Sequence, residues 1–230
     1  MSFFTIRALL STVFLLNMTY SYATELAINS SLKKSIEQLE RHDQLYIKTK
    51  GKAFFKHISD GQKPLFTILT CSDSRVQSNI IDDHPEGNFF TVRNIGNQIQ
   101  TSMGSVDYGI SHLNTQILLI IGHSECGAID AVLGDYKKME PDIVKELDTI
   151  KIDSGVSNIV GVQQNIHNQV NLVLNKYPEK IKKEQLIVVG AVYDFANEMH
   201  KGAGELLIIN INGETNPAQL KKIINMKINN

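Results

Sequence analysis

The chain has 230 residues, of which 42% are hydrophobic and 20% are charged, a composition typical of a globular protein with one sizeable core. Its 23 basic and 24 acidic side chains nearly cancel, and the sequence contains no dense run of Lys and Arg. This balance argues against the basic surface that nucleic-acid-binding proteins carry. We therefore expect one main domain whose partners do not include nucleic acid.

The first 23 residues have the pattern of a secretory signal peptide. They contain no acidic residue, one early basic residue, Arg7, and an apolar run at 8–18 that is too short to span a bilayer. The segment ends on Ser-Tyr-Ala at 21–23, with small residues at the positions that signal peptidase reads. We expect cleavage after Ala23 and export to the bacterial periplasm. An uncleaved anchor and a mitochondrial presequence are the alternatives.

Residues 24–59 are expected to form an N-terminal helical arm. From Ser31 to about Ser59, apolar residues recur at helical spacing with charged residues between them, which predicts one helix or a pair of helices. The apolar positions are Leu32, Ile36, Leu39, Leu45, Phe54 and Phe55. Such an arm could pack on a partner subunit. The main domain is expected at 60–230.

Four apolar, β-branched runs of strand length lie in the main domain. They are residues 64–70, 89–92, 117–121 and 186–189, and their composition is that of strands buried on both faces. Helical periodicity is found at 103–113, 142–150 and 157–177. Strands that alternate with helices indicate an α/β fold with a mostly parallel central sheet covered by helices. The Gly-Ala-Gly segment at 202–204 is expected to be a turn.

Two short motifs hold both cysteines of the chain. Cys71-Ser72-Asp73-Ser74-Arg75 follows the first predicted strand, and His123-Ser124-Glu125-Cys126 follows the third. Because ligands bind beyond the carboxyl ends of parallel strands, we expect the two motifs to meet there. Two thiolates and one imidazole are a ligand set for Zn²⁺ that leaves the fourth, catalytic position open. Asp73 is close enough in sequence to occupy that position or to act beside it.

Each of these residues has a plainer interpretation. Cys71 and Cys126 could form a disulfide in an exported protein, or could be inert core thiols. Asp73 and Arg75 could be a surface ion pair of little energetic weight, and His123 alone could be structural. The five residues together favour a metal site, in which bound zinc would also protect the thiolates from oxidation.

In these motifs the chain resembles the β-class carbonic anhydrases, over about residues 62–211. Segments 93–97 (Arg-Asn-Ile-Gly-Asn), 104–108 and 190–194 resemble further blocks of that family. The resemblance implies reversible hydration of carbon dioxide to bicarbonate and a proton, on Zn²⁺ held by Cys71, His123 and Cys126. It also implies a parallel-cored α/β fold that assembles as a homodimer or larger homo-oligomer. No membrane partner is expected after removal of the signal peptide.

The expected chemistry is attack of zinc-bound hydroxide on carbon dioxide. Zinc lowers the pKa of bound water, as is well known for a carbonic anhydrase with three histidine ligands. Two thiolates leave the ion a weaker Lewis acid, so the neighbouring residues matter more. Asp73 would orient the hydroxide, and Arg75 would hold that carboxylate off the metal in a two-pronged pair. Without the pair, Asp73 becomes a fourth ligand in a closed state.

The resemblance also suggests a substrate pocket and a proton carrier. In the plant-type branch of the family, the positions of Gln62, Phe90, Ile95 and Tyr108 line the carbon dioxide pocket, in part across a subunit boundary. For Phe90 and Ile95 the alternative is ordinary core packing. His112 matches a position proposed to carry protons in that branch, and the alternative is a solvated helix histidine.

One departure separates the branches of the family. The branch with a noncatalytic bicarbonate site has tryptophan three residues before the first cysteine and glycine directly before it. This chain has Ile68 and Thr70 there, and it contains no tryptophan. We therefore expect the plant-type behaviour: no bicarbonate-locked state, and an open site with Asp73 paired to Arg75 at neutral pH.

Two other functions are alternatives. A related zinc hydrolase acting on carbon disulfide or carbonyl sulfide would carry the same motifs. A non-catalytic zinc-binding or thiol-redox protein is the second alternative. The intact Asp73 and Arg75 argue against a non-catalytic protein, and the absence of a Cys-x-x-Cys pair argues against redox work.

Overall fold

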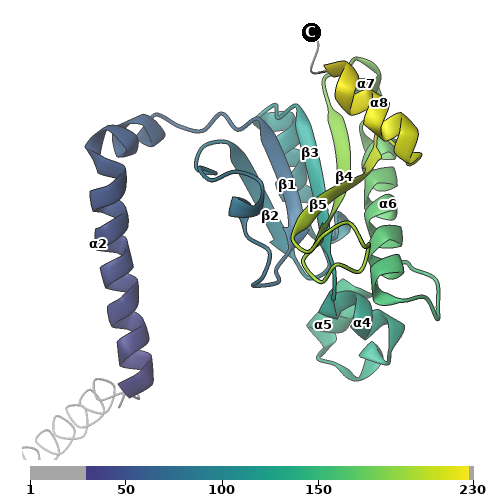
Figure 1. The fold of residues 1–230 in the computed structure, drawn as a ribbon, viewed down its shortest axis with the longest axis horizontal. Helices are drawn as coiled ribbons and strands as arrows, with labels where there is room; N and C mark the ends of the chain where they lie inside the picture. Colours follow the sequence, from purple (N-terminus) through teal and green to yellow (C-terminus); the bar gives the residue numbers. More distant parts are fainter. Residues whose placement is uncertain (1–29, 228–230) are drawn as a thin grey trace, which may run out of the picture. The chain divides into compact units, whose positions relative to one another are not determined.

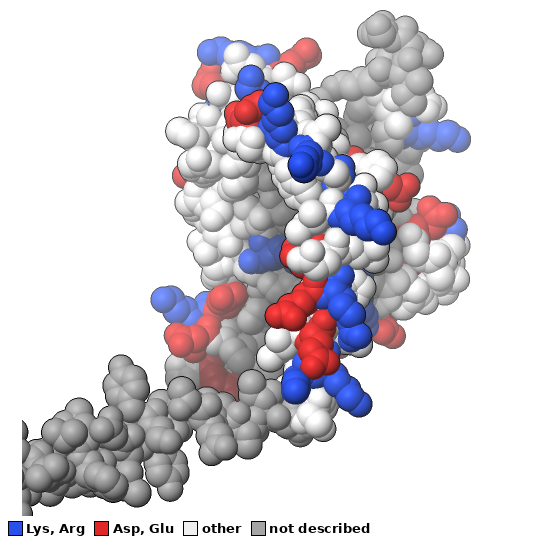
Figure 2. Space-filling view, turned by 90° about the vertical axis from the view of Figure 1, so that its left-hand side faces the viewer, with Lys and Arg blue, Asp and Glu red and all other residues white. Residues whose placement is uncertain are grey.

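The computed structural model describes residues 30–227, so the predicted signal peptide at 1–23 lies outside the described residues. The chain divides into two compact units, one ending at Asp60 and the other beginning at Gly61. Within 30–227, no helix has the length and apolar character needed to cross a membrane. On the face that Figure 2 shows, acidic and basic side chains lie intermingled, without a large area of one sign.

The first unit is the helical arm. Its helix α2 (Ser30–Ser59) is interrupted at Gly51, whose φ of 73° and ψ of 169° are not helical (Figure 1). Glycine adopts this conformation without the steric cost that a Cβ would bring, and the result is the pair of helices that was one of the two predicted forms. No residue of α2 is buried. Its exposed apolar side chains include Leu32, Ile36, Leu39 and Leu45.

The second unit is built on a five-stranded sheet with the order β2-β1-β3-β4-β5. The strands are β1 (Phe66–Cys71), β2 (Phe89–Asn94), β3 (Ile117–His123), β4 (Ile187–Asp194) and β5 (Glu205–Ile211). Strands β1 to β4 pair in parallel, as predicted, and β5 pairs with β4 in the antiparallel sense (Figure 1). The predicted turn at 202–204 leads into β5, a strand that the prediction did not contain.

Strand β2 is not buried on both faces, and here the prediction was wrong. It lies at the edge of the sheet, where β1 is its neighbour, and Phe89 and Phe90 are half-buried while Thr91 is exposed. The central strands β1 and β3 are buried almost throughout. An apolar run by itself does not distinguish an edge strand from a central one, because strand order depends on tertiary pairing.

Helices connect and cover the strands of the sheet. They are α3 (Met103–Asp107), α4 (Gly127–Leu133), α5 (Pro141–Leu147), α6 (Asn158–Lys176), α7 (Pro178–Lys182) and α8 (Pro217–Lys227). Helices α5 and α6 correspond to the predicted helices at 142–150 and 157–177. The predicted helix at 103–113 is divided, because α3 continues into a wider π-helical turn at Tyr108–His112. Helices α4, α7 and α8 were not predicted.

Helix α6 packs closely on the sheet because two facing strand positions are glycine. A Cβ at Gly122 would come within 2.8 Å of side-chain atoms of both Val162 and Ile166, and one at Gly190 would come within 2.6 Å of Ile166. The close approach buries the apolar face of the helix, including Ile166 and Val162. It also fixes the first residue of α6, Asn158, at the edge of the sheet where the metal motifs lie.

His167 makes the stability of this packing depend on pH. Its half-buried ring accepts a hydrogen bond at 3.0 Å from the side-chain amide of Asn210 on β5. Burial lowers the pKa of His167 below its ordinary value of 6.5, so the unfolded chain binds this proton more readily than the folded chain does.

The free energy of unfolding should therefore contain a component that is lost as pH falls through about 6.5. His167→Gln should lack this component. Urea unfolding of both proteins at pH 8 and pH 5 measures it. The wild type should lose more stability than the variant between the two pH values, and equal losses would contradict the role given to His167.

Candidate metal centre

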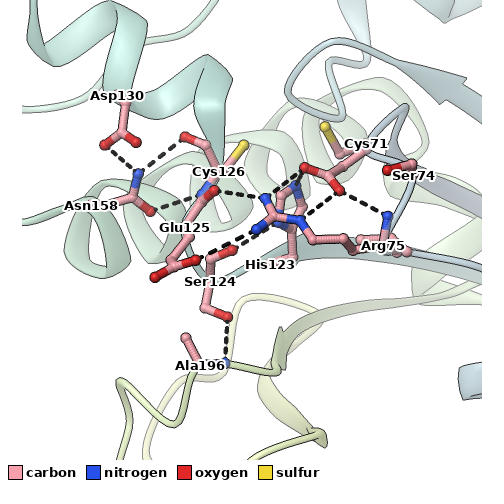
Figure 3. Close-up of polar contacts among 12 residues, drawn as sticks. Cys71, Ser74, Arg75, His123, Ser124, Glu125, Cys126, Asp130, Asn158 and Ala196 are labelled. Atoms are coloured by element: carbon pink, nitrogen blue, oxygen red, sulfur yellow. Dashed lines mark hydrogen bonds and ion pairs between the residues drawn. The ribbon is translucent and has the colours of Figure 1, made fainter.

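The two predicted motifs meet at the carboxyl ends of β1 and β3. Cys71 is the last residue of β1, His123 is the last of β3, and Cys126 stands directly before α4 (Figure 3). One ligand atom from each lies within 4.8 Å of the other two. Tetrahedral zinc with bonds of about 2.0–2.3 Å needs ligand separations of roughly 3.5–4 Å. The three residues are thus placed to hold one ion after a small contraction.

The imidazole of His123 has the tautomer that a metal ligand needs. Its Nδ1 lies 2.9 Å from the backbone carbonyl oxygen of Ser124, to which it can only donate a hydrogen bond. In the neutral imidazole the lone pair therefore remains on Nε2, which is buried and has no hydrogen-bond partner in the described part of the chain. A buried polar atom without a partner costs about 1–3 kcal/mol, and a metal ion would supply that partner.

The two cysteines are free and buried. The pKa values of Cys71 and His123 depend on each other. Interaction with the Cys126 thiol lowers the pKa of Cys71, and the same interaction, together with burial, raises the pKa of Cys126. Burial alone would lower the pKa of His123, but the negative charges of Cys71 and Asp73, together with the hydrogen bond to the Ser124 carbonyl oxygen, raise it. Negative charge thus gathers where a cation would bind.

Cys126 is held in place by Asn158. The side-chain oxygen of Asn158 accepts a hydrogen bond from the backbone N–H of Cys126 at 3.1 Å, and its amide donates to the Cys126 carbonyl oxygen at 3.0 Å (Figure 3). The amide also donates to Asp130 of α4 at 2.6 Å. Two opposed hydrogen bonds fix the peptide groups on both sides of the thiol. Asn158 lies outside both motifs, and sequence reasoning missed it.

Asp73 and Arg75 form a two-pronged pair beside the three ligands. Nε of Arg75 donates to Oδ1 of Asp73 at 2.9 Å, and Nη2 donates to Oδ2 at 2.8 Å. These hydrogen bonds lower the pKa of Asp73, so its carboxyl group is ionised throughout the neutral range. Oδ2 of Asp73 lies 3.8 Å from Nε2 of His123. The carboxylate therefore borders the position that the three ligands leave open.

The guanidinium of Arg93, on β2, binds backbone carbonyl oxygens of the first motif and of the residues after it. Its Nη2 lies within hydrogen-bond distance of the carbonyl oxygens of Cys71 at 3.0 Å, Asp73 at 2.8 Å and Val76 at 2.5 Å. Nη1 donates to the side chain of Gln77 at 3.2 Å. Hydrogen bonds from a charged donor are the stronger kind, so Arg93 determines the path of the loop that carries Asp73.

The predicted pocket residues fall into two groups within this chain. Ile95 packs against the apolar cluster that contains Cys71 and Cys126. Phe90 is paired in register with Thr67, near the beginning of β1, and so lies toward the end of the strand that is remote from Cys71. The structure therefore brings Ile95 to the metal ligands.

The other predicted residues gather away from the ligands. The rings of Phe90 and Tyr108 have centroids 5.6 Å apart, and those of Tyr108 and His112 are 4.5 Å apart. Tyr108 and His112 are exposed, and Gln62 is exposed in the segment before β1. Phe90, Tyr108 and His112 thus form a row of tilted ring contacts that reaches the surface of the chain.

The end of β4 contributes a residue that neither motif contains. Phe195 follows Asp194, the last residue of β4, and its ring stacks on the imidazole of His123 with centroids 5.8 Å apart. Sequence reasoning missed Phe195. The rule that located both motifs, namely the carboxyl ends of parallel strands, also applies to the fourth strand and could have found it.

The chain is similar in sequence to known zinc enzymes, in agreement with the geometry of the site. A family model described as carbonic anhydrase matches residues 66–204. Carbonic anhydrase 2 of Mycobacterium tuberculosis is 30% identical to the chain over 150 residues, which are 59% of this chain and 72% of that protein. These similarities show the family.

Solved structures show the same fold. The structure of the β-carbonic anhydrase CcaA matches with a TM-score of 0.68 and 24% identity, covering 79% of this chain and 89% of that one. One of two tetrameric β-carbonic anhydrases of Sordaria macrospora matches with a TM-score of 0.66 and 20% identity, covering 79% and 98%. Neither similarity distinguishes the branches of the class. The chain belongs to the β-class carbonic anhydrases, which are zinc-dependent carbonate dehydratases.

Proposed function

We propose that this protein hydrates carbon dioxide reversibly to bicarbonate and a proton, with Zn²⁺ held by Cys71, His123 and Cys126. The observation that carries the proposal is the convergence of two sulfur atoms and the unpartnered Nε2 of His123 at one strand edge. When bound, zinc supplies a water of lowered pKa that is nucleophilic near neutral pH. Membership of the family supports the same reaction.

Asp73 is proposed to orient the attacking water. An ionised carboxylate only accepts hydrogen bonds, so Oδ2 of Asp73 would fix one water proton and leave a lone pair directed at carbon dioxide. Arg75 keeps its charge at every physiological pH, and its two hydrogen bonds hold the carboxylate away from the ligand position. We therefore propose an open site at neutral pH and, with Ile68 and Thr70 before Cys71, no bicarbonate-locked state.

The substrate slot is proposed to be mainly apolar. Ile95 provides an apolar surface beside the ligands, which suits a small molecule without charge. The plant-type pocket also contains Gln62, Phe90 and Tyr108, and we propose that these residues serve the site of a neighbouring subunit. The exposed His112, whose ring contacts that of Tyr108, is proposed as the carrier that passes protons to solvent.

Homo-oligomer formation is proposed from the arm. Helix α2 buries none of its residues, although Leu32 is 60% exposed and Leu39 is 70% exposed. An apolar stripe on a long helix is favourable only when another surface covers it. The tetrameric state of the Sordaria macrospora relatives supports the proposal.

Export to the bacterial periplasm is also proposed, on the pattern at 1–23, and a mature protein that begins at Thr24 is the expected product.

Zinc-dependent hydration is the decisive measurement. In stopped-flow assays the wild type should accelerate carbon dioxide hydration, and a chelator or Cys126→Ser should abolish the acceleration. Asp73→Ala should lower kcat/KM by about 10- to 100-fold, as expected for a residue next to metal ligands, with zinc content unchanged.

Asp135→Ala is the control for the Asp73 variant. Asp135 is an exposed carboxylate paired with Lys138, so its removal should leave hydration at the wild-type rate. A fully zinc-loaded wild type that does not accelerate hydration would overturn the proposed function.

The role of Asn158 is tested by metal affinity. Asn158→Ala removes both hydrogen bonds to the backbone of Cys126 and should weaken zinc binding by about 10-fold, the range found for groups that orient metal ligands. Competition with a chromogenic chelator measures the affinity. Asn168→Ala, on the same helix, removes a hydrogen bond to the carbonyl oxygen of Lys151 and serves as the control. Equal zinc affinities in the two variants would contradict the role.

The arm is tested by the mass of the assembly. Light scattering on the wild type as it elutes from a size-exclusion column should give a multiple of the chain mass. Leu39→Asp places a charge on the apolar stripe and should shift the protein toward the monomer, whereas Gln38→Asp places the same charge at a polar position of α2 and should not. A monomeric wild type would rule out the oligomer.

A further inference from the structure

We propose that Phe195 is a positioning residue that holds the guanidinium of Arg75 on Asp73. It thereby keeps the fourth coordination position of the metal ion free. The inference deepens the proposed function and rests on it. Phe195 belongs to neither motif; it reaches the site from the carboxyl end of β4, the strand next to β3.

The ring of Phe195 neighbours both a proposed metal ligand and the arginine. Cζ of Arg75 is 4.5 Å from the centroid of the ring, and the imidazole of His123 stacks on the ring with an interplanar angle of 25°. A guanidinium over an aromatic face is attracted to the negative face of the ring, and its planar shape allows close contact. One side chain therefore contacts both halves of the site.

Arg75 needs such support because its side chain is 45% exposed. Ion pairs of this exposure contribute little on their own, since water competes for both partners. Further contacts come from Glu125, whose carbonyl oxygen accepts a hydrogen bond from Nη2 at 3.1 Å and whose carboxylate lies 3.4 Å from Nη1 (Figure 3). Hydrogen bonds thus fix the edge of the guanidinium, and the ring of Phe195 supports its face.

The loop that carries Phe195 is tied to the second metal motif. The backbone N–H of Ala196 donates to the buried hydroxyl of Ser124 at 3.1 Å (Figure 3). The carboxylate of Asp194 accepts hydrogen bonds from the N–H groups of Glu198 at 3.0 Å and Met199 at 2.8 Å. Because Asp194 is fully buried, these bonds are shielded from water. The ring is therefore presented from a fixed loop.

Loss of the aromatic face would weaken the hold on Arg75 from one side. The guanidinium could then leave Asp73 more often, and the freed carboxylate could turn into the position that it borders, 3.8 Å from Nε2 of His123. Leucine retains apolar contact but has no aromatic face, and tyrosine retains the face. Phe195→Leu and Phe195→Tyr therefore separate the aromatic contribution from simple packing.

The control is Phe89→Leu. Phe89 pairs edge-on with Phe66 at 5.5 Å, at the amino end of the parallel strands and so at the opposite edge of the sheet from the ligands. It is the same substitution at another half-buried ring. Circular dichroism and zinc content, measured first, establish that each variant is folded and binds metal.

The first measurement does not depend on metal. Phenylglyoxal modifies accessible arginines, and mass spectrometry maps the rate at each site. Arg75 should react about 3- to 10-fold faster in Phe195→Leu than in the wild type, in line with the strength of a partly exposed cation–π contact. Phe195→Tyr should react like the wild type. The exposed Arg41 of α2 should react equally in all variants.

The second measurement tests whether the fourth coordination position of the metal ion is free. Thiocyanate binding to the cobalt-substituted protein, followed by visible absorption, should be about 3- to 10-fold weaker in Phe195→Leu and restored in Phe195→Tyr. Carbon dioxide hydration should fall in parallel.

Two outcomes separate the inference from the function. Equal Arg75 reactivity and equal thiocyanate affinity in Phe195→Leu and Phe89→Leu would overturn the role of Phe195. A wild type without hydration activity whose Arg75 is nevertheless released in Phe195→Leu would remove the proposed function and leave the positioning role supported.

Discussion

The common edge at which the parallel strands end is the constraint on which the rest of the structure depends. Pairing aligns Cys71 with Asn94 on β2 and His123 with Tyr193 on β4. Four segments that are far apart in sequence therefore deliver side chains to one place: two proposed metal ligands, the arginine that binds the loop after β1, and an aromatic ring. No single loop contains the site, so its geometry is as rigid as the register of the buried sheet.

Two arginines at this edge act in different ways. Arg93 directs its donors at backbone carbonyl oxygens and determines where the loop after β1 runs. Arg75 directs its donors at a carboxylate and determines which way that carboxylate faces. The first interaction is partly buried, whereas the second borders solvent. A half-exposed pair can change partners more readily than a buried one, which suits a residue beside an open ligand position.

Much of this arrangement could be predicted from the sequence, and the exceptions have a common cause. Apolar runs predict the four parallel strands, and the two motifs predict the convergence of Cys71, His123 and Cys126 and the pairing of Asp73 with Arg75. Asn158 could not be found in this way, because its position depends on how closely α6 approaches Gly122 and Gly190. The edge position of β2 and the antiparallel β5 likewise depend on tertiary pairing, which local pattern does not encode.

The placement of Arg93 on an edge strand has a consequence for assembly. The outer side of β2 carries backbone groups that no strand within residues 30–227 pairs with. A second subunit that paired with this strand would also hold Arg93 in place, and through it the loop that begins at Cys71. Assembly and metal binding would then be thermodynamically linked, each strengthening the other by the same factor. Part of the free energy of subunit association would then contribute to the affinity for the ion.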